Sequence, residues 1–508
     1  MAEVWVCSTH DPDGELDVFC VGGGGIDSVT GIPSGVPSQL FRGVGGKFAA
    51  VGDVSRTDRG TDYSHGCTVS DVNNDGFPDL LVTCFGRSSL LVGQGDGTFT
   101  DQTERTGLIS RQWSTAAAVG DVNSDGNPDV MFVGYVDWKP EVPRVCNDDQ
   151  DRPDICPPQQ YDAVADHLYL NMGDGRFADV SETAGIRSDG KGLGVVAVDL
   201  DGVAPVDFFV ANDVVANHLY VNWDGTSFSE IGQRSGVGLS ESGIPEGSMG
   251  IAVGDVNRDS RPDLLVTNFE LEDNSLYIQR DPLGHFQHST SAFGLGGAAR
   301  RFVGFGTGFT DFDADGWLDL YVLNGHVRYH SRFAEFRQPA LLFQNRSGVR
   351  FHDVTSQGGA WFTVPHCARG GAVGDFNNDG SPDLFVSLLD EPVAVLANRV
   401  SVDHWVSLIL VGTESPRHPV GTKLTLTFSD GTQRTHFVTS GAGYLSSSDV
   451  RILMSVPPAA SSVSADVIWP SGHTDTFSNV QTNTDTVLIE RRTREFPRSV
   501  LQGGHEPE

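Results

Sequence analysis

The chain has 508 residues, with 67 Asp or Glu against 34 Lys or Arg, so its formal net charge is −33. Such an excess of negative charge argues against nucleic acid and anionic membranes as partners. The 61 glycines and the scarcity of charge-rich helical patterns indicate β-structure with many turns, and no stretch is apolar for long enough to predict a transmembrane segment.

A nine-residue pattern occurs five times in intact form, at residues 71–79, 121–129, 255–263, 311–319 and 375–383. Positions 1, 3, 5 and 9 carry Asp or Asn, and position 6 is Gly, or Ser in the third copy. Alternate oxygen ligands can wrap one hard cation, and Gly permits the sharp turn between them. Because the ligands are many and flexible, we predict Ca²⁺ rather than Mg²⁺; the alternative is Asp/Asn turn chemistry without metal. The predicted ligands are Asp71, Asn73, Asp75, Asp79, Asp121, Asn123, Asp125, Asp129, Asp255, Asn257, Asp259, Asp263, Asp311, Asp313, Asp315, Asp319, Asp375, Asn377, Asp379 and Asp383.

Two further copies are incomplete. In residues 9–17 Thr stands at position 1, but Asp11, Asp13 and Asp17 could still hold an ion, so about five Ca²⁺ sites are expected, or six with this copy. In residues 199–207 Val203 removes the ligand at position 5, so Asp199 and Asp207 are expected to bind weakly or not at all. The starts of the seven copies lie 50 to 78 residues apart, a spacing typical of propeller blades with insertions.

Each period predicts four short strands. In the second period one strand precedes the loop at 71–79, a second follows it at residue 80, a third carries the Leu90-Leu-Val run, and a fourth begins at Phe99. Four antiparallel strands per repeat, seven times over, predict an all-β fold with a seven-bladed β-propeller over residues 1–402.

In this topology the connections between strands lie at the two ends of the ring. The Asp loops lie at one end, and the long insertions at 135–165, 235–247 and 324–338 lie at the other, so metal is predicted on one face and recognition on the opposite face. Basic side chains on the insertion face could bind an anionic polymer or a partner's carboxylates, the alternative being local ion pairs. These candidate ligand-binding residues are Arg300, Arg301, Arg328, Arg332 and Arg337.

Three cysteine pairs flank short segments of the chain. Cys7 and Cys20 flank the first Asp loop, Cys67 and Cys84 flank the second, and Cys146 and Cys156 bracket a short Asp- and Pro-rich insertion. If the strands around the loops are antiparallel, each pair falls near the same cross-strand register, so disulfides and an oxidising compartment are expected. The alternative is reduced, buried thiols.

The repeat pattern stops near residue 402. A strand-rich region follows, in which residues 403–490 suffice for a small β-domain, and the polar tail at 491–508 is predicted to be disordered. The N-terminus has neither a basic region nor an apolar core, so we expect that a signal peptide is missing from this chain.

The Asp loops resemble the FG-GAP/VCBS repeats of integrin α-chain propellers. The end of the chain resembles the ASPIC/UnbV domain at His404-Trp405, Gly421–Lys423, Gly441–Ser447 and Trp469–Gly472. Together the two parts resemble the cartilage acidic protein family and its bacterial relatives over residues 1–490. The resemblance implies a secreted, calcium-binding, non-catalytic protein linked to matrix or adhesion.

Catalytic signatures such as Gly-x-Ser-x-Gly, His-Glu-x-x-His and a P-loop are missing from the sequence. We therefore expect a calcium-rigidified binding module that presents loops to an extracellular glycan or protein. One alternative is a calcium-dependent enzyme, such as a polysaccharide lyase with Arg328, His330 or Arg332 as its base. Another is a structural spacer in a secreted assembly.

Overall fold

The computed structural model describes residues 3–7, 14–27, 32–57, 62–142, 144–148, 150–203, 205–281, 284–492 and 494–498. Within these residues the chain is all-β and consists of many small antiparallel sheets, as expected. Helices are limited to single turns.

Seven of the sheets follow one another in the first four-fifths of the described chain. The first sheet contains β1 (Glu3–Cys7), β2 (Asp17–Val21), β5 (Gln39–Val44) and β6 (Lys47–Ala50), and the second contains β7 (Tyr63–Ser70), β8 (Asp79–Phe85), β9 (Ser89–Gly93) and β10 (Phe99–Asp101). The third contains β11 (Ser114–Gly120), β12 (Asp129–Gly134), β15 (His167–Asn171) and β16 (Phe177–Asp179), the fourth β17 (Gly192–Val198), β18 (Asp207–Asn212), β19 (His218–Asn222) and β20 (Phe228–Glu230), and the fifth β21 (Ile251–Gly254), β22 (Asp263–Val266), β23 (Ser275–Asp281) and β24 (His285–His288). The sixth contains β25 (Gly304–Thr310), β26 (Asp319–Asn324), β27 (Leu341–Arg346) and β28 (Arg350–Asp353), and the seventh β29 (Ala368–Gly374), β30 (Asp383–Leu388) and β31 (Ala394–Leu396).

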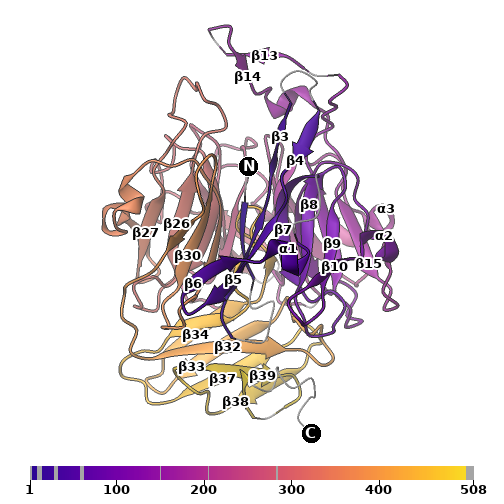
Figure 1. Cartoon of the computed structure of the whole chain (residues 1–508). Coiled ribbons are helices and arrows are strands. Elements are labelled where there is room, and N and C mark those ends of the chain that lie inside the picture. The colour runs from indigo at the N-terminus through magenta and orange to yellow at the C-terminus, as the bar shows by residue number, and fades with distance from the viewer. Residues whose placement is uncertain are drawn as a thin grey trace.

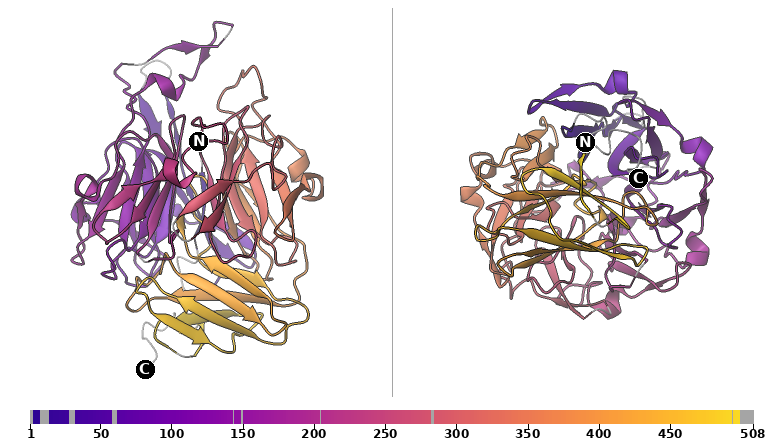
Figure 2. Two further views of the ribbon diagram at one scale, coloured as in Figure 1. Left: turned by 180° about the vertical axis from the view of Figure 1, so that it is seen from behind. Right: turned by 90° about the horizontal axis from the view of Figure 1, so that it is seen from below.

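The first strands of these sheets contact one another in sequence order and close on themselves, since β1 contacts both β7 and β29. Figure 2 shows the resulting ring of sheets seen along its axis. The inner strands are almost wholly buried, and their small and β-branched side chains pack against the neighbouring sheet, as in β11 and β17. Each sheet thus buries its faces against the next, which a single sheet could not do alone.

Short helical turns follow the outermost strands in the first four sheets. They are α1 (Gly52–Ser55), α2 (Thr103–Thr106), α3 (Ser181–Ala184) and α4 (Gly232–Ser235). The last three end on a left-handed Gly, which explains the Gly-plus-aliphatic ends that recur in the sequence. Three 3₁₀ turns lie elsewhere: η1 (Pro158–Gln160), η2 (Thr355–Gln357) and η3 (Trp361–Thr363).

Two two-stranded sheets extend from the ring. They are β3 (Gly24–Ile26) with β4 (Pro33–Gly35), and β13 (Cys146–Asn147) with β14 (Pro153–Asp154). Both project from the end of the ring opposite the C-terminal sheets (Figure 1).

The C-terminal part contains two packed four-stranded sheets. One is β36 (Ile452–Ser455), β32 (Trp405–Val411), β39 (Asp485–Ile489) and β40 (Phe496–Pro497), and the other is β34 (Gln433–Phe437), β33 (Lys423–Phe428), β37 (Val463–Ile468) and β38 (Thr474–Phe477). Their shared core includes Trp469, which is 1% exposed. Strand β40 falls inside the segment predicted to be disordered, and the chain beyond residue 498 lies outside the described residues.

The segment after β34 leaves the C-terminal sheets and enters the channel of the ring. Strand β35 (Ser440–Gly441) pairs with β17, and Gly443 exchanges two backbone hydrogen bonds with Ile251, of 2.6 and 2.8 Å. Tyr444 packs against Phe305 with ring centroids 4.9 Å apart, and Leu445 joins the same core. We call residues 440–446 the plug, because they fill the channel between the inner strands.

The cysteine expectations are corrected in part. Cys146 and Cys156 form a disulfide. Cys67 and Cys84 are buried and form none, because Ser70 pairs with Asp79 and this register places Cys67 opposite Val82, two residues before Cys84. Cys20 is likewise outside a disulfide, since the backbone register places it opposite Val4, not Cys7.

Candidate metal centre

Each Asp loop in the described chain joins the first and second strands of a sheet. Position 1 follows the first strand, and position 9 begins the second, as Asp71 and Asp79 do between β7 and β8. Because the strands run the same way round the ring, the loops gather at one end of it, the end that carries the C-terminal sheets (Figure 1).

Position 1 shapes the loop by accepting backbone hydrogen bonds. The Asp71 carboxylate accepts from the N–H groups of Asp75 (3.0 Å) and Gly76 (2.7 Å), and the loops that start at 121, 255 and 375 repeat both bonds. Positions 4 and 6 have positive φ in all five intact loops, including Ser260 at 63° in place of Gly. The loop conformation is therefore stabilised by hydrogen bonds within the chain itself.

The Asp at position 9 is buried, and its hydrogen bonds link the second strand to the loop and to the third strand. Asp79 accepts hydrogen bonds from Val72 N (3.0 Å) on its own loop and Gly93 N (2.9 Å) on the third strand. The same pair of bonds recurs at Asp129, Asp207, Asp263, Asp319 and Asp383. These aspartates have a structural role in addition to the metal ligation predicted for most of them.

Burial raises the pKa of the loop carboxyls, because it disfavours their charged form. At position 9 the pKa rises to about 8 in Asp79, Asp129, Asp263 and Asp319 and to about 7 in Asp383. At position 1 it rises to about 6 in Asp71, Asp255, Asp311 and Asp375. A bound cation would oppose this shift by favouring the carboxylates.

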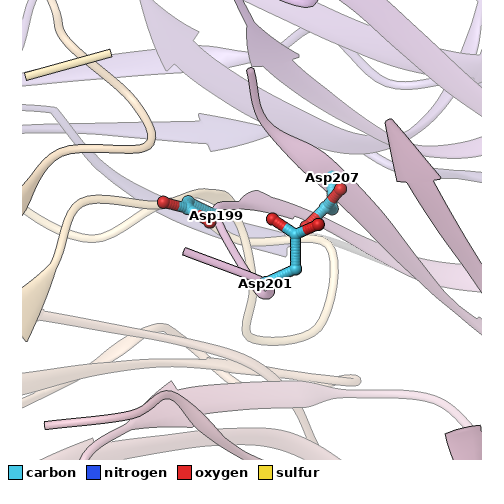
Figure 3. A group of neighbouring side chains, drawn as sticks. All are labelled: Asp199, Asp201 and Asp207. Carbon is cyan, nitrogen blue, oxygen red and sulfur yellow. The ribbon is translucent and has the colours of Figure 1, made fainter. Parts of the chain in front are cut away.

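Among the described residues, two loops bring three carboxylates together with ligand oxygens within 4.8 Å of one another. One group is Asp311, Asp313 and Asp315 in an intact loop, and the other is Asp199, Asp201 and Asp207 in the incomplete one. Figure 3 shows the second group, whose carboxylates come from one short turn and the start of β18. Either group could hold a metal ion, and oxygen-only ligands suit a hard cation such as Ca²⁺.

The group at Asp311 fits a cation best. Its Oδ1 atom is buried without a hydrogen-bond partner, whereas Oδ2 accepts from Gly316 N (2.9 Å) and Ser455 Oγ (2.6 Å). In the intact loops with Asn at position 3, the Asn amide instead donates to the carboxylate at position 5, over 2.9–3.0 Å. The count of five or six Ca²⁺ ions stays a prediction.

The incomplete loop at 199–207 differs from its expectation. Asp201 at position 3 was not among the predicted ligands, yet it meets Asp199 and Asp207, so the missing position-5 ligand does not prevent a three-carboxylate group. The signal was present in the sequence, since only this loop and the one at 311 combine Asp at positions 1, 3 and 9 among the described copies. Of the first copy, Asp17 is buried and accepts from Gly43 N (2.9 Å), and Asp11 and Asp13 lie outside the described residues.

The C-terminal sheets rest directly on the Asp loops. Arg417 N donates to Asn74 Oδ1 (2.9 Å), and Lys423 Nζ donates to Ser260 O (2.7 Å). The Arg451 guanidinium donates to Asn378 Oδ1 (2.7 Å) and Asp375 O (2.8 Å). Four different loops, counting that of Asp311, are therefore held by side chains or backbone of the C-terminal part.

In four sheets an asparagine at the end of the third strand, or just after it, also ties neighbouring loops together. Asn222 Nδ2 donates to Val122 O (2.8 Å) on the loop of the preceding sheet, and Asn171, Asn345 and Asn398 make the equivalent bond. These asparagines end short apolar runs that recur in the sequence, such as Leu168-Tyr-Leu-Asn171 and Leu219-Tyr-Val-Asn222. The pattern was visible, but its role needed the contact between sheets.

On the opposite end, the predicted ligand-binding arginines are mostly engaged in ion pairs. Arg300 pairs with Asp273 (3.6 Å), Arg328 with Asp154 (3.6 Å) and Arg337 with Glu391 (2.6 Å). Arg332 lies over the Phe333 ring, and Arg301 is exposed. The Arg328–Asp154 pair joins two insertions, and a ligand-binding role for these arginines stays a prediction.

Three histidines of this end have structural partners. His65 stacks between Tyr63 and Trp113, His326 lies 3.3 Å from Glu270, and His366 pairs with Glu391 (2.8 Å). Trp138 packs against Phe85 and Trp113.

Parts of the chain match two known families. Residues 71–132, 255–322 and 311–386 match the FG-GAP-like repeat, and residues 412–495 match ASPIC and UnbV. The resemblance inferred from the motifs is thereby confirmed for both parts of the chain.

The chain is also distantly similar to cartilage acidic protein 1. It is 24% identical over 320 residues to the Xenopus tropicalis protein, covering 61% of this chain and 47% of that one. It is 24% identical over 310 residues to the Mus musculus and Homo sapiens proteins, covering 60% of this chain and 45% and 44% of theirs. The chain thus spans about half the length of the curated relatives it matches.

Solved structures with a related shape include two lectins. A lectin of Agrocybe aegerita, described as recognising non-reducing terminal N-acetylglucosamine, has 14% identity and a TM-score of 0.41 over 79% of this chain and 81% of that one. The BP39L lectin of Burkholderia pseudomallei has 11% identity and a TM-score of 0.42 over 78% and 94%. At these scores neither neighbour indicates a ligand for this chain.

Proposed function

We propose that this protein is an extracellular, calcium-binding, non-catalytic recognition module, built on a seven-bladed propeller of FG-GAP-like repeats. Ca²⁺ in the Asp loops would rigidify one end of the ring, on which the C-terminal part rests. The opposite end would present its inserted loops to a partner.

The observation that carries this proposal is the gathering of exposed apolar side chains on the inserted loops. Val142, Val145 and Ile155 flank the disulfide-closed β13–β14 hairpin and are 71%, 83% and 57% exposed. Tyr329 and Phe333 in the insertion at 324–338 are 62% and 61% exposed. Exposed apolar groups on adjacent loops, rimmed by ion pairs, are typical of an interaction surface.

The chemistry of this end favours a protein partner over a glycan. Valine and isoleucine bury area against other apolar side chains, whereas sugar recognition relies on aromatic faces and hydrogen-bonding groups. The disulfide supports an oxidising, extracellular setting. Among the described residues no helix has the length and apolar character needed to cross a bilayer.

The first test is a binding screen of the whole chain against extracellular matrix proteins and glycans, in Ca²⁺ and again in EDTA. Calcium binding is measured separately by titration calorimetry. We expect Ca²⁺ to bind, and one class of partner to be retained more strongly in Ca²⁺ than in EDTA. The double variant Val145→Ser/Ile155→Ser should lose the partner, whereas Val349→Ser, at a valine 70% exposed in the turn between β27 and β28, should not.

The result that would overturn the proposal is absence of calcium binding, or a partner that binds both variants equally. Cleavage of a polysaccharide by the wild type, lost on substitution of Arg328, His330 and Arg332, would instead favour the enzyme alternative. A protein that binds calcium and no partner would fit a structural spacer.

A further inference from the structure

A cavity of about 260 Å³ lies where the C-terminal part meets the Asp-loop end of the ring. Its walls come from the loops that start at 255 and 311, from β34, and from the segment that follows the plug. The volume is enough for several water molecules or for one small ligand.

One cationic group in the wall comes from the ring. Arg258 is position 4 of its loop, with φ of 58°, and its guanidinium stacks over Trp317 at 3.6 Å. Within the described part of the chain this guanidinium has no hydrogen bond and no ion pair, and its Nη2 atom is buried without a partner. Stacking therefore fixes the plane of the group but leaves its donors free.

The second cationic group comes from the C-terminal part. Arg434 on β34 donates from Nη1 to Ser455 Oγ (3.0 Å) and lies over the Phe428 ring at 5.1 Å. Its Nε atom is buried without a partner. The two guanidiniums lie close enough to repel each other. Two arginines from different parts of the chain thus lie at one cavity, and each has a buried N–H group without a hydrogen-bond partner.

The charges around the cavity depend on the loops. Asp255 and Asp311 also contribute to its wall. Together with Asp315 they attract Arg258, and Asp311 attracts Arg434, although among the described residues none of these pairs forms a direct ion pair. If the loops carry Ca²⁺, as the proposed function requires, their carboxylates are neutralised by the metal. The two guanidiniums then lack a counter-charge, and a guanidinium fork matches an oxyanion in bidentate geometry.

From this arrangement we propose that the cavity binds a small oxyanion, a sulfate-like or carboxylate group held between Arg258 and Arg434 when the loops carry calcium. The inference rests on the proposed function for its calcium dependence. The ligand would bridge the ring and the C-terminal part and so strengthen the joint between them.

The test is titration calorimetry of the whole chain with sodium sulfate and, separately, sodium glucuronate, in Ca²⁺ and in EDTA, with ionic strength matched by sodium chloride. We expect saturable binding of at least one probe in Ca²⁺, and at least tenfold weaker binding in EDTA, where the loop carboxylates repel the anion. Sulfate alone would point to an inorganic or sulfated source, and glucuronate alone to an organic acid.

The variants Arg258→Gln and Arg434→Gln should each weaken binding at least tenfold, because each removes one fork. Arg234→Gln, which alters an exposed arginine on α4 outside every proposed site, is the matched control and should leave binding unchanged. Arg434→Lys keeps the charge and loses the fork, so it tests the geometry if Arg434→Gln fails to fold.

Three results would overturn the proposal: no binding of either probe although calcium binds, equal binding in Ca²⁺ and EDTA, or equal binding by wild type and Arg258→Gln. The first of these leaves the proposed function standing, since calcium binding is measured in the same protein. Failure to bind calcium would remove the proposed function itself.

Discussion

Gly441 in the plug offers a sharp test of how the two parts of the chain are joined. Its φ is 79°, and a Cβ atom at this position would lie 2.1 Å from Val195 O on the inner strand β17. Gly431, in the hairpin turn between β33 and β34, has a similar φ of 89° but open space around the same position. The two glycines share the backbone strain of an alanine substitution, and only one of them has the steric contact.

The expected loss of stability follows from the backbone strain of an alanine and from the hydrogen bonds that the added Cβ atom would break. Left-handed strain costs about 1 kcal/mol for Ala at either site. At Gly441 the plug must also move by more than ~1 Å to reach an ordinary contact, and three hydrogen bonds lie in its path: Ala442 N to Val195 O (3.1 Å) and the pair between Gly443 and Ile251. At about 1 kcal/mol for each bond, Gly441→Ala should cost about 4 kcal/mol and Gly431→Ala about 1.

The assay is urea unfolding of both variants in Ca²⁺, followed by intrinsic fluorescence, with limited proteolysis of the plug as a second readout. Gly441→Ala should lower the midpoint several times more than Gly431→Ala and expose residues 440–446 to cleavage. Equal shifts for the two variants, with the plug still protected, would show that its fit in the channel is not what joins the C-terminal part to the ring.

Three further predictions follow from buried contacts. Asn222→Ala removes the hydrogen bond to Val122 O on the neighbouring loop and should lower the free energy of unfolding in urea by about 2–3 kcal/mol. Asn147→Ala, the control at an exposed amide bonded to Asp151, should lower it by less than about 0.5 kcal/mol. Equal losses would refute the role of the inter-sheet bond. Burial lowers the pKa of His65 to about 3, so the folded state holds this ring neutral. The contribution of His65 to stability should therefore fall by up to about 1.4 kcal/mol per pH unit as pH falls from about 6.5 towards 3, and should stay constant above 6.5. His65→Phe should remove this contribution from the pH profile of thermal stability, and a profile with the same slope in both proteins would contradict the assignment. Non-reducing peptide mapping should join Cys146 to Cys156 and leave Cys67 and Cys84 as free thiols, and a Cys67–Cys84 cross-link would show that the strand register is wrong.

The repeat and the class of fold follow from the sequence alone. Asp at position 9 recurs because it begins each second strand and clamps it to the loop and to the third strand, so the spacing of the loops predicts the spacing of the sheets. Position 6 recurs as Gly because the turn needs positive φ there. Both requirements concern residues within one loop or sheet. Because every repeat needs the same residue at the same position, the pattern can be recognised in a single sequence.

Which groups meet depends on how the sheets pack in three dimensions. The Gly441–Ser447 motif was visible as a resemblance, but its place in the channel depends on β17 and β21, about 245 and 190 residues earlier in the chain. Arg258 and Arg434 lie on different parts of the chain and come to one cavity because the C-terminal sheets rest on the Asp loops. The Cys67–Cys84 expectation failed for a related reason, since an offset counted along the sequence does not include the register that the paired strands adopt. Contacts between distant segments arise from packing the sheets together, and packing leaves no periodic signal in the sequence of either segment.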